Sequence, residues 1–432
     1  QEGHRLAGRA GAGQATLPDT SMESAPVSNA GKVFFAAVLV AAWAIAPVTE
    51  AQPPIRIGAS LSLTGTYAAF GQNQNRGYQL CVKHTNEKGG VLGRKIEFVH
   101  YDDQSQPATA VGLYEKLITR EKVDAVLGPY GSPITDAVAD VTEKYRMPLV
   151  THAGTTSIFR KGRKFMFMLF PPGEVYFEGL MDLAAKKGLR TVAVINEDTF
   201  FPKTVARGAM ELAKKKGLEL ILTEAYPKGT TDFSAILRRL GAVIPDVLAA
   251  GTYFDDAVAI LRQMKELGVS PRMYGVTLAA DLPKFYETLG RTAEFVYGPT
   301  PWEPELVTLR AGGLIPIARQ YPGAREFVES YRREFPGADF SYNSAAGYAI
   351  CQILVEATRR AGSLDGPKMR DAILKLDMNT VFGAFKVDQD GVQIAGKMLM
   401  LQWQDGKKVI VWPEELAPGK ARFPTPPWSQ RP

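Results

Sequence analysis

The sequence predicts an α/β protein made of two lobes, each a doubly wound parallel sheet. Its 432 residues exceed what one hydrophobic core usually supports, so two compact lobes are expected. From residue 55 onward, short apolar segments alternate with amphipathic ones, and the alternation starts again after Phe170-Pro171-Pro172-Gly173. Repeated strand–crossover–strand units are typical of parallel sheets with helices on both faces.

The first series opens with an apolar strand that ends in a glycine-containing loop at 64–71. The helix after this loop is stopped by Gly89-Gly90, and a later helix has Pro107 near its first turn. The predicted elements are a strand at 55–63, a helix at 72–87, a strand at 95–101, a helix at 107–121, a strand at 123–128, a helix at 133–145 and a strand at 148–151.

The second series repeats this rhythm, and Asp232 is predicted to cap one of its helices. Its elements are a helix at 175–187, a strand at 191–195, a helix at 204–216, a strand at 218–225, a helix at 232–240, a strand at 247–251, a helix at 255–267 and a strand at 272–276.

The third part of the chain is less regular. An irregular segment at 297–308 precedes helices at 324–334, 344–361 and 367–375, strands at 381–386, 397–404 and 409–412, and a proline-rich tail at 413–432. Asp405-Gly406 supplies a turn between the last two strands.

The N-terminal residues resemble an export signal. Met22 fits a translation start, an apolar run of 14 residues spans 33–46, and Thr49-Glu50-Ala51 matches a small-x-small cleavage site. We therefore expect residues 1–51 to be a non-native extension plus a signal peptide. Because no cysteine follows the cleavage site, a lipid-anchored form is not expected.

Composition excludes some functions. The formal net charge is +6, but basic residues are spread among acidic ones, so no nucleic-acid partner is predicted. The two cysteines, Cys81 and Cys351, lie 270 positions apart in predicted helices and form no metal or redox motif. We expect two buried free thiols, since a disulfide would require the two helices to be neighbours.

No enzyme motif is found in the sequence. It has no P-loop, no Gly-x-Gly-x-x-Gly after a strand and no Gly-x-Ser-x-Gly elbow. The histidines His84 and His100 lack metal-ligand spacing. Adjacent Asp102 and Asp103 end a strand and are predicted to cap a turn rather than to act as acid and base. We therefore predict a protein that is not an enzyme and holds no metal and no cofactor.

Two loops that follow predicted strands are candidates for binding an anion. In Gly131-Ser132-Pro133, Ser132 is the expected N-cap, and Ala153-Gly154-Thr155 opens a second polar loop. Free N–H groups and hydroxyls at a helix start suit a carboxylate, although capping alone would explain either loop. His152 ends a strand, where ligands bind in such sheets, but we favour a structural role for it.

The chain resembles the substrate-binding proteins of branched-chain amino acid ABC importers, which form the Leu/Ile/Val-binding family. The resemblance spans about residues 55–412. It rests on Ile57-Gly58, Leu63-Thr64-Gly65, Phe70-Gly71, Arg76-Gly77, Asn86-Glu87-Lys88-Gly89-Gly90-Val91-Leu92-Gly93-Arg94, Tyr101-Asp102-Asp103, Val126-Leu127-Gly128 with Ser132, and Thr230-Thr231-Asp232-Phe233.

The resemblance implies the type I periplasmic binding fold, in which two α/β lobes joined by three crossings close on a ligand. It places 55–172 and 299–376 in lobe 1 and 173–298 and 377–412 in lobe 2. It further implies a periplasmic protein that delivers a small-molecule carboxylate to a cognate ABC permease in the inner membrane. A ligand-sensing module for a receptor is the alternative of the same fold.

The resemblance also implies ligand contacts. The carboxylate would be held by Ser132 and by the loop of Ala153, Gly154 and Thr155. Aromatic contacts would come from Phe70, Phe201, Trp302, and Tyr253 or Phe254, and Tyr130 adds to an aromatic cleft.

One departure concerns the ligand. Amino-acid binders of this family carry an acid that pairs with the ligand ammonium, whereas this chain has Thr277-Leu278-Ala279 at that place. A buried ammonium without a carboxylate is costly, so an aromatic or apolar acid without an α-amino group is predicted. Asp281 could compensate, which keeps an apolar amino acid as the alternative. The family's first-lobe disulfide is absent, since Ser105 and Gly131 occupy its positions.

Overall fold

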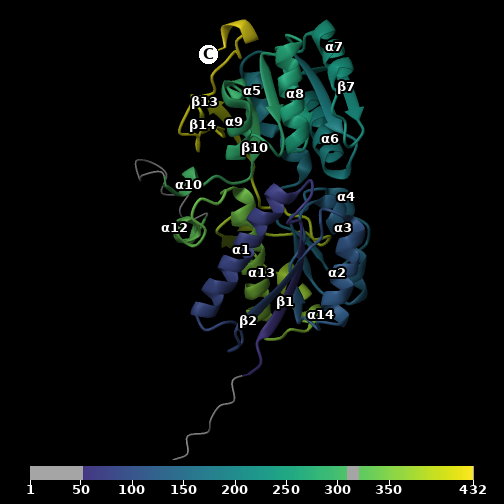
Figure 1. The fold of residues 1–432 in the computed structure, drawn as a ribbon, viewed down its shortest axis with the longest axis vertical. Coiled ribbons are helices and arrows are strands. Elements are labelled where there is room, and N and C mark those ends of the chain that lie inside the picture. Colours follow the sequence, from purple (N-terminus) through teal and green to yellow (C-terminus); the bar gives the residue numbers. More distant parts are fainter. Residues whose placement is uncertain (1–51, 309–320, 432) are drawn as a thin grey trace, which may run out of the picture. The chain divides into compact units, whose positions relative to one another are not determined.

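The computed structural model describes residues 52–308 and 321–431. The predicted extension and signal peptide at 1–51 lie outside this range. Figure 1 traces the described elements in chain order. Among the described helices, every one is too short or too polar to cross a lipid bilayer.

A parallel sheet is formed by the first elements of the chain. Strand β1 (Ile55–Leu61) lies between β2 (Ile96–Asp102) and β3 (Ala125–Val126). Strand β4 (Leu149–Thr151) pairs in parallel with β5 (Met166–Met168), and the N–H of Gly128 donates to the carbonyl of Val150 beyond the end of β3. The helices between these strands are α1 (Ala68–Glu87), α2 (Pro107–Thr119), α3 (Ser132–Lys144) and α4 (Thr156–Phe159).

A second, larger sheet has the strand order β14-β13-β10-β9-β8-β6-β7. Its strands are β6 (Thr191–Glu197), β7 (Glu219–Tyr226), β8 (Val247–Gly251), β9 (Met273–Val276), β10 (Tyr297–Thr300), β13 (Leu399–Gln404) and β14 (Lys407–Trp412). Strands β6 to β10 run parallel, and the last two add an antiparallel edge. Every residue of β8 and β9 is buried, as expected for central strands covered on both faces.

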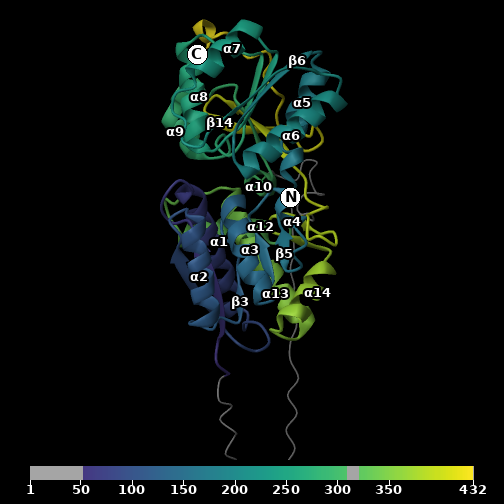
Figure 2. The same cartoon turned by 90° about the vertical axis from the view of Figure 1, so that its right-hand side faces the viewer.

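Helices cover this larger sheet. They are η1 (Gly173–Val175), α5 (Glu178–Lys186), α6 (Phe200–Lys215), α7 (Ser234–Val243), α8 (Phe254–Glu266), α9 (Pro283–Leu289) and η2 (Gly290–Ala293). Figure 2 shows α5 and α6 on one side of the sheet and α8 and α9 on the other.

The rest of the chain returns to the first sheet before it joins the second. The returning elements are α10 (Glu305–Thr308), α12 (Ala324–Glu334), α13 (Tyr342–Ala361), α14 (Gly366–Leu374) and the hairpin of β11 (Met378–Thr380) and β12 (Gly383–Phe385). Next to this hairpin, the N–H of Val381 donates to Gln352 on α13. A 3-10 turn, η3 (Trp428–Gln430), lies near the end of the tail, where the Trp428 indole donates to the carbonyl of Val269.

Helices α1 and α13 lie side by side (Figure 1), and two glycines lie at their contact. A Cβ on Gly77 would clash with the backbone of Ser344, and one on Gly347 would clash with the backbone of Gln74. The two backbones therefore touch directly. Next to this contact, the Tyr348 hydroxyl lies 2.8 Å from the His84 Nδ1 atom.

The expectation of two free thiols was wrong. Cys81 on α1 and Cys351 on α13 form a disulfide, with their Cα atoms 6.2 Å apart. The glycine contact brings the helices close enough for the bridge, and sequence spacing alone could not show that the two helices are neighbours.

The largest differences between predicted and observed elements lie at helix starts and after strands. Helix α1 begins at Ala68 rather than near residue 72, because Gly71 lets the helix press against the backbone of Ser62 instead of ending a loop. Strand β10 lies where an irregular segment was predicted; Pro299 has no N–H, but its neighbours still pair with β13. Helix α9 and strand β5 were not predicted. The lobe boundaries at 172, 298 and 376 stay a prediction.

The disulfide gives a first testable prediction. We expect replacement of Cys81 and Cys351 by alanine to lower the free energy of unfolding by about 2–4 kcal/mol, because the unfolded chain loses a long covalent loop. Thermal unfolding by circular dichroism, with and without a reductant, measures the effect. The reductant should lower the Tm of the wild type and leave the double variant unchanged; alkylation of two thiols in unreduced, denatured protein would contradict the bridge.

Candidate ligand-binding site

A cavity lies beyond the carboxyl ends of strands from both sheets, with about 310 Å³ of space that no atom fills, the open solvent at its mouth included. Ligands of doubly wound proteins bind at such strand ends. We call it the central cavity; its lining residues are Tyr130, Gly131, Ser132, His152, Gly154, Phe170, Tyr176, Phe201, Tyr253, Leu278, Tyr342 and Asn343.

Ser132 reaches the cavity from the first turn of α3. Gly131 adopts a φ of 79°, which glycine tolerates, and this turns the chain from β3 into the helix. The N-cap position is therefore Gly131, and the prediction of Ser132 as N-cap was wrong by one residue. The Ser132 hydroxyl is buried and caps nothing, so it remains available to a ligand.

Gly154 lets the two halves of the site approach each other. A Cβ at this position would lie 2.7 Å from a ring carbon of Phe201, so only glycine leaves room for the ring. The carbonyl of Gly154 accepts a hydrogen bond of 2.7 Å from the N–H of Gly173. The neighbouring Ala153 N–H donates to the Thr151 hydroxyl and is already used, whereas the buried Thr155 hydroxyl has no partner among the described residues.

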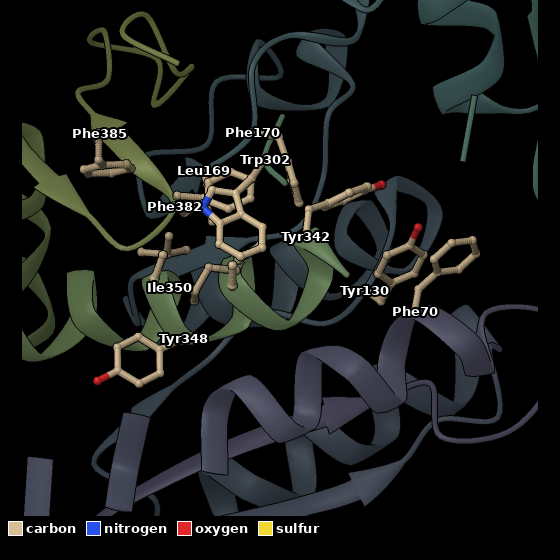
Figure 3. Close-up of a cluster of buried hydrophobic side chains, with 14 of the residues drawn as sticks. Phe70, Tyr130, Leu169, Phe170, Trp302, Tyr342, Tyr348, Ile350, Phe382 and Phe385 are labelled. Atoms are coloured by element: carbon tan, nitrogen blue, oxygen red, sulfur yellow. The ribbon is translucent and has the colours of Figure 1, made fainter. Parts of the chain in front are cut away.

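The predicted aromatic residues separate into two groups. Tyr130, Phe201 and Tyr253 line the central cavity. Phe70 does not; its ring stacks on that of Tyr130 with centroids 4.9 Å apart, as Figure 3 shows, and it lines a separate hollow instead. Phe254 lines the same separate hollow as Phe70, beside Asp255 and Arg262.

Two further predicted residues are built into the fold. Trp302 is fully buried in the cluster drawn in Figure 3. Its ring packs edge-on against those of Phe327 and Phe340. Thr277 is also fully buried; its hydroxyl donates to the Thr252 carbonyl and accepts from the Thr252 N–H. Neither residue lines the central cavity.

The sequence analysis did not assign several of the lining residues to the site. Phe170 lies in the predicted crossover but had not been assigned to the site, and Tyr176 follows it. Tyr342 and Asn343 begin α13, far along the chain and after no strand, so no local signal marked them. His152, to which a structural role had been assigned, lines the cavity.

Buried polar atoms without partners gather at this cavity. Within the described residues, the Ser132 hydroxyl, both ring nitrogens of His152 and the Asn343 Oδ1 atom accept or donate no hydrogen bond. Buried polar groups are normally paired, and leaving one unpaired costs about 1–3 kcal/mol. The arrangement is therefore suited to receive polar atoms of a ligand.

A buried charged cluster lies next to the cavity. The Lys408 ammonium donates to the Glu303 carboxylate at 2.6 Å and to the backbone carbonyl of Asp281 at 2.7 Å. The Asp281 carboxylate is buried, and neither oxygen has a partner in the described part of the chain. Burial raises the pKa of Asp281 to about 6, with Lys408 opposing the shift.

Asp281 is electrostatically close to the cavity walls although it does not line them. Burial and then the charge of Asp281 raise the pKa values of Tyr130 and Tyr342 well above their usual range. Of the described residues around the cavity, none carries a carboxylate, and no group of three or more His, Cys, Asp or Glu side chains in the described ranges could hold a metal ion.

Comparison with known families identifies the chain. The profile of the family described as periplasmic binding protein matches residues 54–408, which is most of the described chain. The chain belongs to the periplasmic binding protein family.

Relatives of this periplasmic binding protein carry the names expected from the sequence. Leu/Ile/Val-binding protein homolog 7 of Brucella melitensis is 27% identical over 399 residues, covering 88% of this chain and 96% of the relative. The resemblance to the Leu/Ile/Val-binding proteins is thus confirmed.

Solved structures confirm the predicted type I fold. The substrate-binding protein LivJ of Streptococcus pneumoniae, in complex with isoleucine, has a TM-score of 0.72 at 23% identity and covers 82% of this chain and 97% of its own. The leucine-binding protein LivK of Thermotoga maritima has the same TM-score and coverage at 25% identity. A solute-binding protein of Rhodopseudomonas palustris, in complex with benzoate, has a TM-score of 0.69 at 19% identity and covers 83% and 95%.

The buried Asp281 of this periplasmic binding protein makes its stability depend on pH. Its pKa of about 6 in the folded state lies about 2 units above the value of an exposed aspartate, so its favourable contribution is complete below about pH 4 and is lost as the pH rises through 6. We expect Asp281→Asn to remove up to about 3 kcal/mol of this pH dependence. Urea unfolding at pH 4.5 and pH 8 measures it, with the exposed Asp198→Asn as control; parallel profiles for wild type and Asp281→Asn would contradict the assignment.

Proposed function

We propose that this protein is the extracytoplasmic solute-binding component of an ABC importer. It captures a small carboxylate with an aromatic or other apolar body and no α-amino group, between two lobes that close about a hinge. It works in the periplasm after removal of its signal peptide and delivers the ligand to a cognate permease in the inner membrane. The proposed class of ligand rests on one observation, which is the set of residues that line the central cavity.

The cavity has polar atoms for a carboxylate and apolar walls for the rest of the ligand. The Ser132 hydroxyl and the His152 ring offer hydrogen bonds that the described chain does not use. Hydrophobic and aromatic walls with a few placed polar groups are typical of small-molecule sites. These walls are formed by Phe170, Tyr176, Phe201, Tyr253, Leu278 and Tyr342.

The hydrogen bonds of Thr277 favour a ligand that has no amino group. At the place where amino-acid binders of this family carry an acid, both hydrogen-bonding functions of the Thr277 side chain are satisfied by Thr252. A ligand ammonium there would be buried without a negative partner, which costs several kcal/mol. The fold itself accepts both classes, since one similar structure holds isoleucine and another holds benzoate.

An apolar amino acid is the second candidate, and Asp281 favours it. Its buried carboxylate has no hydrogen-bond partner among the described residues, and its charge acts on the tyrosines of the cavity wall. A ligand ammonium that reached Asp281 would supply the hydrogen-bond donors that these carboxylate oxygens lack.

A screen with matched ligand pairs distinguishes the two candidates. The pairs differ only in the amino group: 3-phenylpropionate against phenylalanine, and 4-methylvalerate against leucine. A ligand at 100 times its Kd adds about 2.7 kcal/mol of stability, which thermal shift resolves. We expect shifts with the acids, retained in Asp281→Asn; shifts with the amino acids that disappear in Asp281→Asn would establish the second candidate instead.

Ser132 provides a test of the site itself. We expect Ser132→Ala to weaken binding of the carboxylate found in the screen by about 1–2 kcal/mol, roughly five- to thirty-fold in Kd, because a hydrogen bond to a charged group is lost. Isothermal titration calorimetry measures the change. Ser157→Ala, an exposed serine on the nearby helix α4, is the matched control; equal affinities for all three proteins would remove Ser132 from the site.

A further inference from the structure

His152 is the titratable side chain placed in the wall of the central cavity. It directly follows β4, at the strand end where the predicted anion-binding loop begins. Only 4% of the residue is exposed, and both ring nitrogens are buried without a hydrogen-bond partner in the described ranges. A histidine whose role was purely structural would be expected to use at least one of these nitrogens.

The surroundings of the ring are mostly aromatic. The ring centroid lies 5.1 Å from that of Phe170 and 6.0 Å from that of Tyr130, and Tyr342 and Asn343 of α13 line the same cavity. This environment offers no charge that would hold a proton on the imidazole. Burial lowers the pKa of His152 to about 3, which the nearby backbone of Asn343 offsets only in part, so the ring is neutral in the empty protein at neutral pH.

The charged groups on the surrounding elements are already engaged or lie behind the wall. On η1, Glu174 forms an ion pair with Arg207 and accepts a hydrogen bond from Thr156. In the loop after β9, Asp281 lies near Lys408, which in turn pairs with Glu303. Among the described lining residues, His152 is therefore the side chain that can become positively charged when an anion enters the cavity.

We propose that His152 determines the specificity for a carboxylate by taking up a proton from solvent as the ligand binds, so that the resulting imidazolium donates a hydrogen bond to the ligand carboxylate. This inference rests on the proposed carboxylate-binding function. The reaction balances as one proton plus neutral imidazole plus carboxylate giving an imidazolium–carboxylate pair, which leaves the net charge of the filled cavity at its empty value. Asn343 Oδ1, an unpaired acceptor in the same cavity, is available to the second N–H of the ring.

The pairing predicts a direction for the pH dependence of binding. An opposite charge beside the ring raises its pKa in the bound state above the value of about 3 in the empty protein. The bound protein then holds more protons than the free one at every pH between the two pKa values. Affinity therefore increases as the pH falls through this window, by up to about tenfold per pH unit, and is constant above the bound-state pKa.

Calorimetry with defined probes tests this. Wild type is titrated with 3-phenylpropionate and with L-leucine in two buffers of different ionisation enthalpy at pH 6 and pH 8, which gives the number of protons taken up. We expect uptake of up to one proton on binding and a tighter Kd at pH 6. In His152→Gln, which keeps a polar side chain, uptake should vanish and the Kd should become independent of pH.

Matched variants separate the alternatives. Ser132→Ala should weaken binding but keep the proton uptake, because a serine does not titrate in this range, and Asp281→Asn should also keep it. Binding without proton uptake, uptake that persists in His152→Gln, or uptake lost in Asp281→Asn would each overturn the role of His152 while leaving the carboxylate function intact. Failure of both probes to bind folded wild type would overturn the carboxylate function and this inference with it. If His152→Gln does not fold, the numbers of protons taken up by the wild type and by Asp281→Asn are compared instead. Uptake that is kept in Asp281→Asn supports the role of His152, and uptake that is lost there overturns it.

Discussion

Helices α1 and α13 cross so closely that a side chain at either glycine of the contact would strike the backbone of the other helix. This contact joins segments that lie far apart in the chain, as the separation of 270 positions between Cys81 and Cys351 also shows. It fixes the start of α13, and with it Tyr342 and Asn343, against the loops that follow β3 and β4. The cavity wall contributed by α13 thus depends on a helix contact that begins at Ser344, directly after the lining residues.

At the cavity, buried polar side chains of the described chain lack the hydrogen-bond partners that such groups usually have in a protein interior. Many buried polar side chains of the described fold are tied to backbone or to each other, as Thr277 is to Thr252 and Asp103 is to Ser60 and Ser62, although Asp281, Trp302 and Tyr274 also keep unpartnered polar atoms outside the cavity lining. At the cavity, Ser132 and His152 are buried and left without partners. Each such group lowers the stability of the empty protein, and a ligand that supplies the missing partner recovers this free energy on binding.

Much of the fold could be predicted from the sequence, because strand and helix periodicity is a local property. The strand–helix rhythm, the turn role of Asp102 and Asp103, and the loops at Ser132 and Gly154 were all predicted from local patterns. The failures concern contacts made at long range. The Cys81–Cys351 bridge and the packing of Trp302 with Phe327 depend on which helices become neighbours, and residue spacing does not encode this. The same holds for the site, where Phe70 stacks on Tyr130 without reaching the cavity and Tyr342 comes from a helix far along the chain.

The bridge between Cys81 and Cys351 also closes a covalent ring that spans 270 positions of the chain. All the residues that line the central cavity, from Tyr130 to Asn343, fall inside this ring. A single backbone cut by a protease anywhere between the two cysteines therefore cannot release a fragment. The pieces stay joined through sulfur, and a nicked molecule keeps its mass, apart from one added water, until a reductant separates them.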